Sequence, residues 1–130
     1  MKHGIDYSLY LCTDRRLMTS PTIEASAESA LRGGTTVIQL REKDCSSREF
    51  YELGLRVKKI TDAYHAPLII NDRVDIALAV GAAGVHVGQG DLPCKVVREI
   101  VGPDMIVGVS GARLEEAVRA EEEGGDYLGV

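Results

Sequence analysis

Short apolar runs alternate with longer amphipathic stretches along the whole sequence, and this alternation constrains the fold more than any other feature. The runs expected to form strands are, in chain order, Ser8–Thr13, Val37–Leu40, Leu68–Ile70, Gly84–Val87, Met105–Val109 and Tyr127–Val130. Short, continuously apolar strands that alternate with helices indicate a parallel sheet with its helices packed outside. Because no linker or low-complexity segment divides the 130 residues, we expect a single domain over residues 1–130.

Capping signals mark where the helices between these strands begin. Ser20 and Pro21 have the residue types that favour an N-cap and a first helical position, which predicts a helix running to Arg32. Ser46 and Glu49 match a capping box and predict the start of a long amphipathic helix. Both helices would cover the sheet that the apolar runs form.

Two architectures fit this alternation, a doubly wound open sheet and a (β/α)8 barrel of the TIM type. The first strand is not followed by GxGxxG, and no GxxxxGK[ST] occurs, which disfavours a nucleotide-binding open sheet. The predicted class is therefore α/β, of the (β/α)8 TIM-barrel type. Such a barrel needs eight strands and about 250 residues, and this chain supplies about five and a half βα units. We expect a partial barrel, truncated in the sixth strand, that forms a homo-oligomer through its exposed edges.

Charge and composition argue against several classes of partner. The formal net charge of −5 disfavours a general nucleic-acid or membrane-surface binder. No apolar run approaches about 18 residues, and the N-terminus lacks an apolar signal core. The three cysteines are far apart and show no metal-binding spacing, which fits a reducing cytosol. We expect a cytoplasmic protein that binds small molecules, without nucleic-acid or membrane partners.

Polar residues follow the predicted strands at their C-terminal ends, where chemistry is located in parallel α/β folds. After the second strand, Gln39, Arg41 and Lys43 occupy alternate positions, and alternate residues of an extended chain share a face. One amide and two cations would therefore converge on the barrel mouth, where a guanidinium and an ammonium can bind phosphate oxygens. The alternative is a solvated loop whose cations pair with Glu42 or Asp44.

Two aspartates follow neighbouring strands. Asp72 comes after Asn71 at the end of the third strand, and Asp91 follows the fourth strand. Two carboxylates from adjacent strand tips suit Mg²⁺, which is usually held by one or two carboxylates together with substrate phosphates. The alternative is that each aspartate caps the helix that follows it, and capping does not exclude metal binding.

A serine and a histidine near the next strand ends are less specific signals. The Ser110 hydroxyl at the end of the fifth strand could bind a phosphate oxygen or a leaving group, or could cap the helix that begins near Leu114. No nearby Asp/His pair supports a nucleophilic triad. We interpret His86, inside the fourth strand, as a hydrogen-bonded packing residue.

Five motifs, in order and in register, resemble the thiamine phosphate synthase family, also called thiamine-phosphate pyrophosphorylase. They are YLCTDR near the start, QLREK at 39–43, INDRVDIAL at 70–78, GVHVGQGDLP at 84–93 and GVS at 108–110. The resemblance implies a (β/α)8 barrel enzyme with Mg²⁺ as cofactor. It would join hydroxymethylpyrimidine diphosphate to a thiazole phosphate, giving thiamine phosphate and diphosphate. Diphosphate would leave first, and the thiazole nitrogen would then capture the pyrimidine carbocation.

The resemblance also assigns site residues. The predicted metal ligands are Asp72 and Asp91, the predicted catalytic residues are Arg41, Lys43 and Ser110, and the predicted substrate-binding residues are Gln39, Arg41, Glu42, Lys43, Asn71 and Ser110. After the sixth strand the family continues with two further βα units that supply the thiazole-phosphate site. Two alternatives remain open: a non-catalytic fragment, inactive as an isolated 130-residue chain, and a thiazole tautomerase-like paralogue of the same fold. The retained diphosphate-binding motifs favour the synthase.

Overall fold

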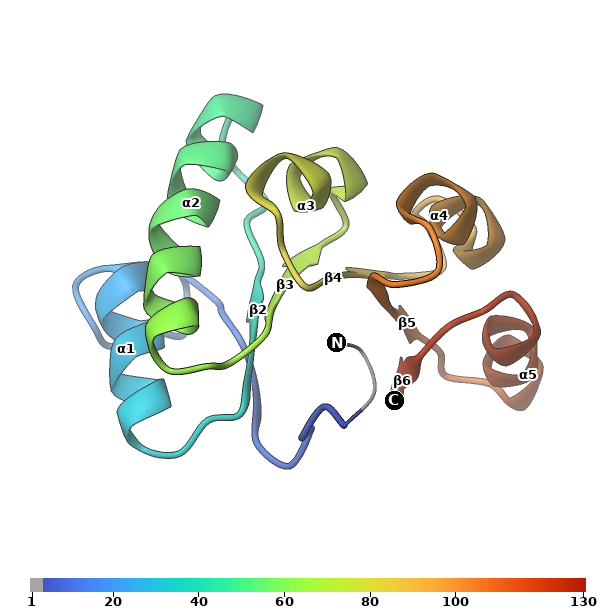
Figure 1. Cartoon of the computed structure of the whole chain (residues 1–130), viewed down its shortest axis with the longest axis horizontal. Helices are drawn as coiled ribbons and strands as arrows, with labels where there is room; N and C mark the ends of the chain where they lie inside the picture. Colours follow the sequence, from blue (N-terminus) through green and yellow to red (C-terminus); the bar gives the residue numbers. More distant parts are fainter. Residues whose placement is uncertain (1–3) are drawn as a thin grey trace.

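The computed structural model describes residues 4–130, and within them six parallel strands form one sheet in sequence order (Figure 1). The strands are β1 (Tyr10–Cys12), β2 (Val37–Leu40), β3 (Leu68–Asn71), β4 (Gly84–Val87), β5 (Ile106–Ser110) and β6 (Tyr127–Gly129). The helices between them are α1 (Ile23–Arg32), α2 (Ser47–Ala63), α3 (Val74–Val80), α4 (Cys94–Val101) and α5 (Leu114–Glu122). Over these residues, no helix is long and apolar enough to cross a membrane.

The sheet curls into a half-barrel, and the helices cover its convex side (Figure 1). Each strand pairs in parallel with its neighbour in the sequence. A doubly wound sheet would instead reverse its strand order and place helices on both faces. The predicted α/β class and the preference for a barrel-type sheet over a doubly wound one are therefore confirmed.

Both faces of the sheet are packed, which explains the continuously apolar strands. On the convex side, residues such as Ile38 and Ile70 pack with Phe50 of α2 in the main hydrophobic core. On the concave side, Val37 and Ile69 belong to a smaller buried cluster, which also includes Ile106 and is covered partly by the tyrosines of β1 and β6. Alternate residues of one strand thus point to opposite faces.

The start of α1 differs from the sequence prediction. Thr22 is the N-cap, with extended backbone at φ −137° and ψ 160°, and its hydroxyl accepts a hydrogen bond of 3.1 Å from Ala25 N. The prediction of Ser20 as N-cap and Pro21 as the first helical residue was wrong, because a threonine with the same capping chemistry lies directly before the helix. The capping box that begins α2 is confirmed.

Glycine shapes the concave face where β5 meets β6. Gly108 pairs in register with Tyr127, and a Cβ atom at this position would overlap the tyrosine ring. Gly84 on β4 is similarly crowded, since its Cβ would come within 2.6 Å of Ile106 Cβ. Gly108 therefore leaves room for the Tyr127 ring inside the half-barrel, and Gly84 leaves room for the Ile106 side chain.

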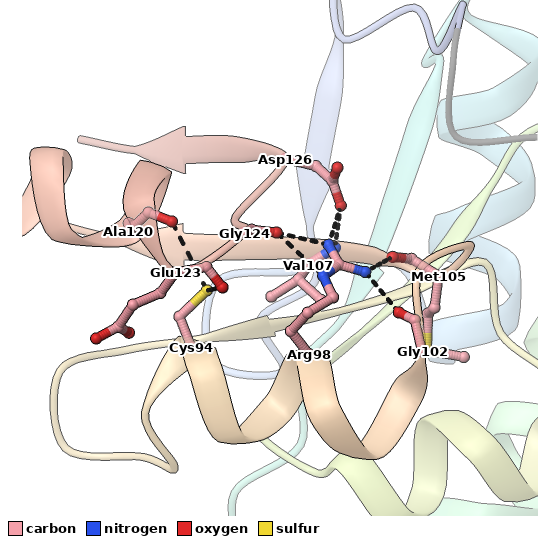
Figure 2. A network of polar contacts seen from close by, with 9 residues as sticks. All are labelled: Cys94, Arg98, Gly102, Met105, Val107, Ala120, Glu123, Gly124 and Asp126. Carbon is pink, nitrogen blue, oxygen red and sulfur yellow. Dashed lines mark hydrogen bonds and ion pairs between the residues drawn. The ribbon is translucent and has the colours of Figure 1, made fainter.

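Arg98 of α4 joins three chain segments at the end of the sheet where the strands begin (Figure 2). Its Nη1 donates to the carbonyl oxygens of Gly102 and Met105 at 2.8 and 2.7 Å. Its Nε and Nη2 donate to Gly124 O at 3.1 and 2.7 Å, and Nη2 also bonds the Asp126 carboxylate at 2.6 Å. One guanidinium therefore fixes the loops that lead into β5 and β6.

Candidate active site

The concave face opens into a cavity of about 830 Å³ that is lined by residues of all six strands. Four of the predicted site residues line it, namely Gln39, Arg41, Asn71 and Ser110. Ser110 and Asn71 are the last residues of their strands, and Arg41 directly follows β2. The cavity therefore lies at the C-terminal ends of the strands, where the sequence placed the candidate site.

The two predicted cations lie on the rim of this site, with Arg41 half-buried and Lys43 exposed. Lys43 Nζ donates to the Asp72 carboxylate, and Arg41 Nη1 lies 3.8 Å from Asp14 Oδ2. Glu42 points to the opposite side, as the alternation predicted: its side chain is 4% exposed and accepts a 2.6 Å bond from Arg15 Nε. The alternative pairing of Arg41 and Lys43 with Glu42 or Asp44 is not the arrangement found.

The two aspartates meet beside Lys43. The Asp72 and Asp91 carboxyl groups lie close enough to shift each other's pKa, and Asp91 Oδ2 accepts a 2.8 Å hydrogen bond from Gly88 N. Neither caps a helix, because the N-caps of α3 and α4 are Arg73 and Pro93, and neither cap makes a side-chain bond. The capping alternative for both aspartates was therefore wrong.

The surroundings of this pair shift the pKa values of the two carboxyl groups in opposite directions. Burial raises the pKa of Asp91. The hydrogen bond from Gly88 N lowers it, the neighbouring Asp72 charge raises it further, and the net shift is upward. Burial also acts to raise the pKa of Asp72, but hydrogen bonds with Lys43 and Asp91 outweigh it and hold the pKa below its usual value. Two carboxyl groups in contact need a proton or a cation between them.

A divalent cation fits this pair by charge and by donor type. In the part of the chain that the structure describes, no cluster of three or more His, Cys, Asp or Glu residues could hold a metal. Two carboxylates are nevertheless enough for Mg²⁺ when phosphate and water oxygens complete its octahedron. Asp72 and Asp91 could therefore hold Mg²⁺ together with a bound phosphate group.

A buried polar group on the cavity wall was only partly predicted from the sequence. His86 is buried and hydrogen-bonded, as predicted, with Nε2 2.7 Å from Ser110 Oγ and Nδ1 3.0 Å from Tyr127 OH. Burial lowers the pKa of His86, which favours the neutral imidazole. Ser110 does not cap α5, whose N-cap is Arg113. Tyr127 and Tyr10 were not predicted as site residues, although strand alternation places both on the concave face.

The sequence and the fold of this chain are both similar to those of known proteins. Residues 9–130 match the family described as thiamine monophosphate synthase. Thiamine-phosphate synthases of Clostridium botulinum and Clostridium beijerinckii are 61% and 62% identical over all 130 residues, which span 61% and 62% of those proteins. The structure of thiamine phosphate pyrophosphorylase from Pyrococcus furiosus matches with a TM-score of 0.88 and 46% identity, over 95% of this chain and 59% of that one. The chain thus spans about three fifths of the length of these relatives.

Proposed function

The chain belongs to the thiamine monophosphate synthase family, and from this premise we propose that it forms the diphosphate-binding part of a thiamine phosphate synthase. The enzyme couples hydroxymethylpyrimidine diphosphate to a thiazole phosphate and releases diphosphate. Mg²⁺ is its cofactor, its partners are these two small-molecule substrates, and it works in the cytoplasm.

The observation that supports this proposal best is the meeting of Lys43, Asp72 and Asp91 at three neighbouring strand tips. A departing diphosphate accumulates negative charge. Lys43 and Arg41 have the sign to stabilise that charge, and Mg²⁺ held by the two aspartates would neutralise diphosphate oxygens. Removing one such preorganised group typically costs on the order of 10²–10³ in rate.

The remaining predicted residues have proposed roles consistent with their positions. Gln39 and Asn71 are buried on the concave face and offer amides to the pyrimidine end of the substrate. Ser110, on the cavity wall, contacts the departing diphosphate. Glu42 supports the substrate-binding residues indirectly, because its hydrogen bond from Arg15 joins the β1–α1 loop to the loop that contains Lys43.

The family relationship also supports a proposal for the complete fold. We propose that residues 1–130 are part of a single (β/α)8 barrel domain, in which two further βα units close the gap between β6 and β1. Alone, the half-barrel presents β1 and β6 as sheet edges. Such edges associate readily, so we propose that the isolated chain forms homo-oligomers through them.

The experiment that tests the proposed function is a coupling assay with both substrates and Mg²⁺. It is run on the 130-residue chain and on the product of the complete reading frame, and thiamine phosphate and diphosphate are quantified. We expect equal amounts of both products from the complete protein. Activity from the complete protein alone would identify the 130 residues as an inactive fragment. Isomerisation of a thiazole phosphate without coupling would overturn the proposal in favour of a tautomerase-like paralogue.

Replacing Arg41 with alanine should weaken the binding of Mg²⁺-diphosphate by about 10- to 100-fold, because a charge-assisted hydrogen bond contributes roughly 1.5–3 kcal/mol. The Arg41–Asp14 pair is exposed and spans 3.8 Å, so the fold should lose little stability. Titration calorimetry with inorganic diphosphate measures the change. Arg56→Ala is the matched control, since Arg56 pairs with Glu24 on the outer helices. Equal affinity in the Arg41 variant and the control would remove Arg41 from the site.

A further inference from the structure

One row of hydrogen-bonded side chains crosses the concave face and forms part of the cavity wall. Gln39 Nε2 donates to Tyr10 OH at 2.7 Å, and the Tyr10 hydroxyl contacts the Tyr127 hydroxyl. Tyr127 OH lies 3.0 Å from His86 Nδ1, and His86 Nε2 lies 2.7 Å from Ser110 Oγ. The row thus joins five of the six strands along the cavity wall and ends on the Ser110 hydroxyl.

The donor and acceptor roles along this row are fixed at its Gln39 end. An amide nitrogen can only donate and an amide oxygen can only accept. Cys12 Sγ lies 3.5 Å from Gln39 Oε1, and its thiol donates to that oxygen. The Gln39 nitrogen therefore faces Tyr10, whose oxygen must accept.

The donor-to-acceptor direction at Gln39 determines the direction of the next hydrogen bonds in the row. Each phenol has a single hydroxyl hydrogen, which lies in the ring plane in one of two orientations. The side of Tyr10 OH toward Gln39 is filled by the amide hydrogen, so the phenolic hydrogen turns to Tyr127. By the same reasoning Tyr127 donates to His86 Nδ1. A neutral imidazole has one acceptor and one donor nitrogen, so the His86 hydrogen is on Nε2 and faces Ser110 Oγ.

We propose that His86 is a positioning residue that fixes Ser110 as a hydrogen-bond donor toward the cavity. Because His86 Nε2–H donates to Ser110 Oγ, the Ser110 hydrogen does not point at the imidazole and is turned outward. A hydroxyl held in this orientation can bind an anionic oxygen without first rotating. That use rests on the proposed function, in which the anion is the departing diphosphate.

The tautomer of His86 tests the polarity of the row without any substrate. Long-range ¹H–¹⁵N spectra of labelled protein, recorded near pH 8, should show the His86 hydrogen on Nε2. Gln39→Glu places an acceptor at the far end of the row, so each hydrogen should reverse and His86 should be protonated on Nδ1. Tyr127→Phe removes the donor to Nδ1 without removing the ring, and should mix the two tautomers. The exposed His65 is an internal control whose spectrum should stay unchanged.

Two results would overturn the proposal. The first is an unsubstituted protein with the His86 hydrogen on Nδ1. The second is a tautomer that neither Gln39→Glu nor Tyr127→Phe changes. Failure of the coupling assay would leave these spectra unaffected, so the proposed function and this inference fail separately.

The effect on catalysis has its own comparison in the complete enzyme. His86→Gln keeps an N–H donor near the Nε2 position, whereas His86→Leu removes it. We expect His86→Leu to lower kcat on the order of tenfold relative to His86→Gln, with a smaller change in KM. Equal kcat in the two variants, with both folded, would contradict a positioning role.

Discussion

Replacing Asp72 with asparagine is expected to lower turnover by on the order of 10²–10³ and to raise the Mg²⁺ concentration needed for activity. The Asp72 carboxylate accepts a hydrogen bond from Lys43 and interacts with Asp91, so its charge would balance both the proposed metal and the lysine of the proposed diphosphate site. Asparagine is preferred to alanine because Asp72 has a φ of 65°, a left-handed conformation that asparagine tolerates. The measurement is the coupling rate of the complete enzyme over a Mg²⁺ titration.

Asp75 provides the matched control for this change. It lies three residues away on α3, and its carboxylate pairs with Arg73 at 2.8 Å outside the cavity. Asp75→Asn should therefore keep the Mg²⁺ dependence of the unsubstituted enzyme. If Asp72→Asn also kept full turnover at limiting Mg²⁺, Asp72 would not be a metal ligand.

Replacing Arg98 with methionine is expected to lower the free energy of unfolding by about 2–4 kcal/mol. The Arg98 side chain is 17% exposed, and it bonds carbonyl oxygens of Gly102, Met105 and Gly124 together with the Asp126 carboxylate. Methionine keeps part of the apolar stem but supplies no donor, so these acceptors lose a partner in a largely buried place. Urea denaturation followed by circular dichroism measures the loss.

Arg32→Met is the control, since the Arg32 side chain is 69% exposed and pairs with Glu28 within α1. Exposed pairs of this kind contribute about 0.3–0.5 kcal/mol. Arg98 lies at the end of the sheet where β5 and β6 begin (Figure 2), and it is not one of the residues that line the cavity. Folded Arg98→Met protein should therefore bind Mg²⁺-diphosphate with unchanged affinity. Equal destabilisation by the two substitutions would contradict the structural role of Arg98.

The sequence predicted those parts of the site that depend on strand order and alternation. Asp72 and Asp91 follow neighbouring parallel strands, whose C-terminal ends must lie side by side. Arg41 and Glu42 are adjacent in an extended segment, so they point to opposite faces of the sheet. Both conclusions need only local pattern and the βα alternation.

Other features depend on how the whole sheet curves. Tyr10 and Tyr127 are 117 residues apart and lie on the two outermost strands, β1 and β6, so their contact exists only because the sheet curls. No local pattern indicates that curvature. The partners of Arg98 are mainly backbone carbonyls, which every residue has, so the sequence offers no signal for them. The cap at Thr22 was missed because Ser20 offered the same chemistry nearby.

The most direct test of the account is the position of a metal bound together with diphosphate. Mn²⁺ accepts the same carboxylate and phosphate ligands as Mg²⁺ and can be located in a crystal by its anomalous scattering. With inorganic diphosphate and Mn²⁺ present, we predict an anomalous peak within about 2.5 Å of carboxylate oxygens of both Asp72 and Asp91. The diphosphate should lie between that peak and the side chains of Arg41 and Lys43. Diphosphate bound at another place, or bound here with no metal at the two aspartates, would contradict the account.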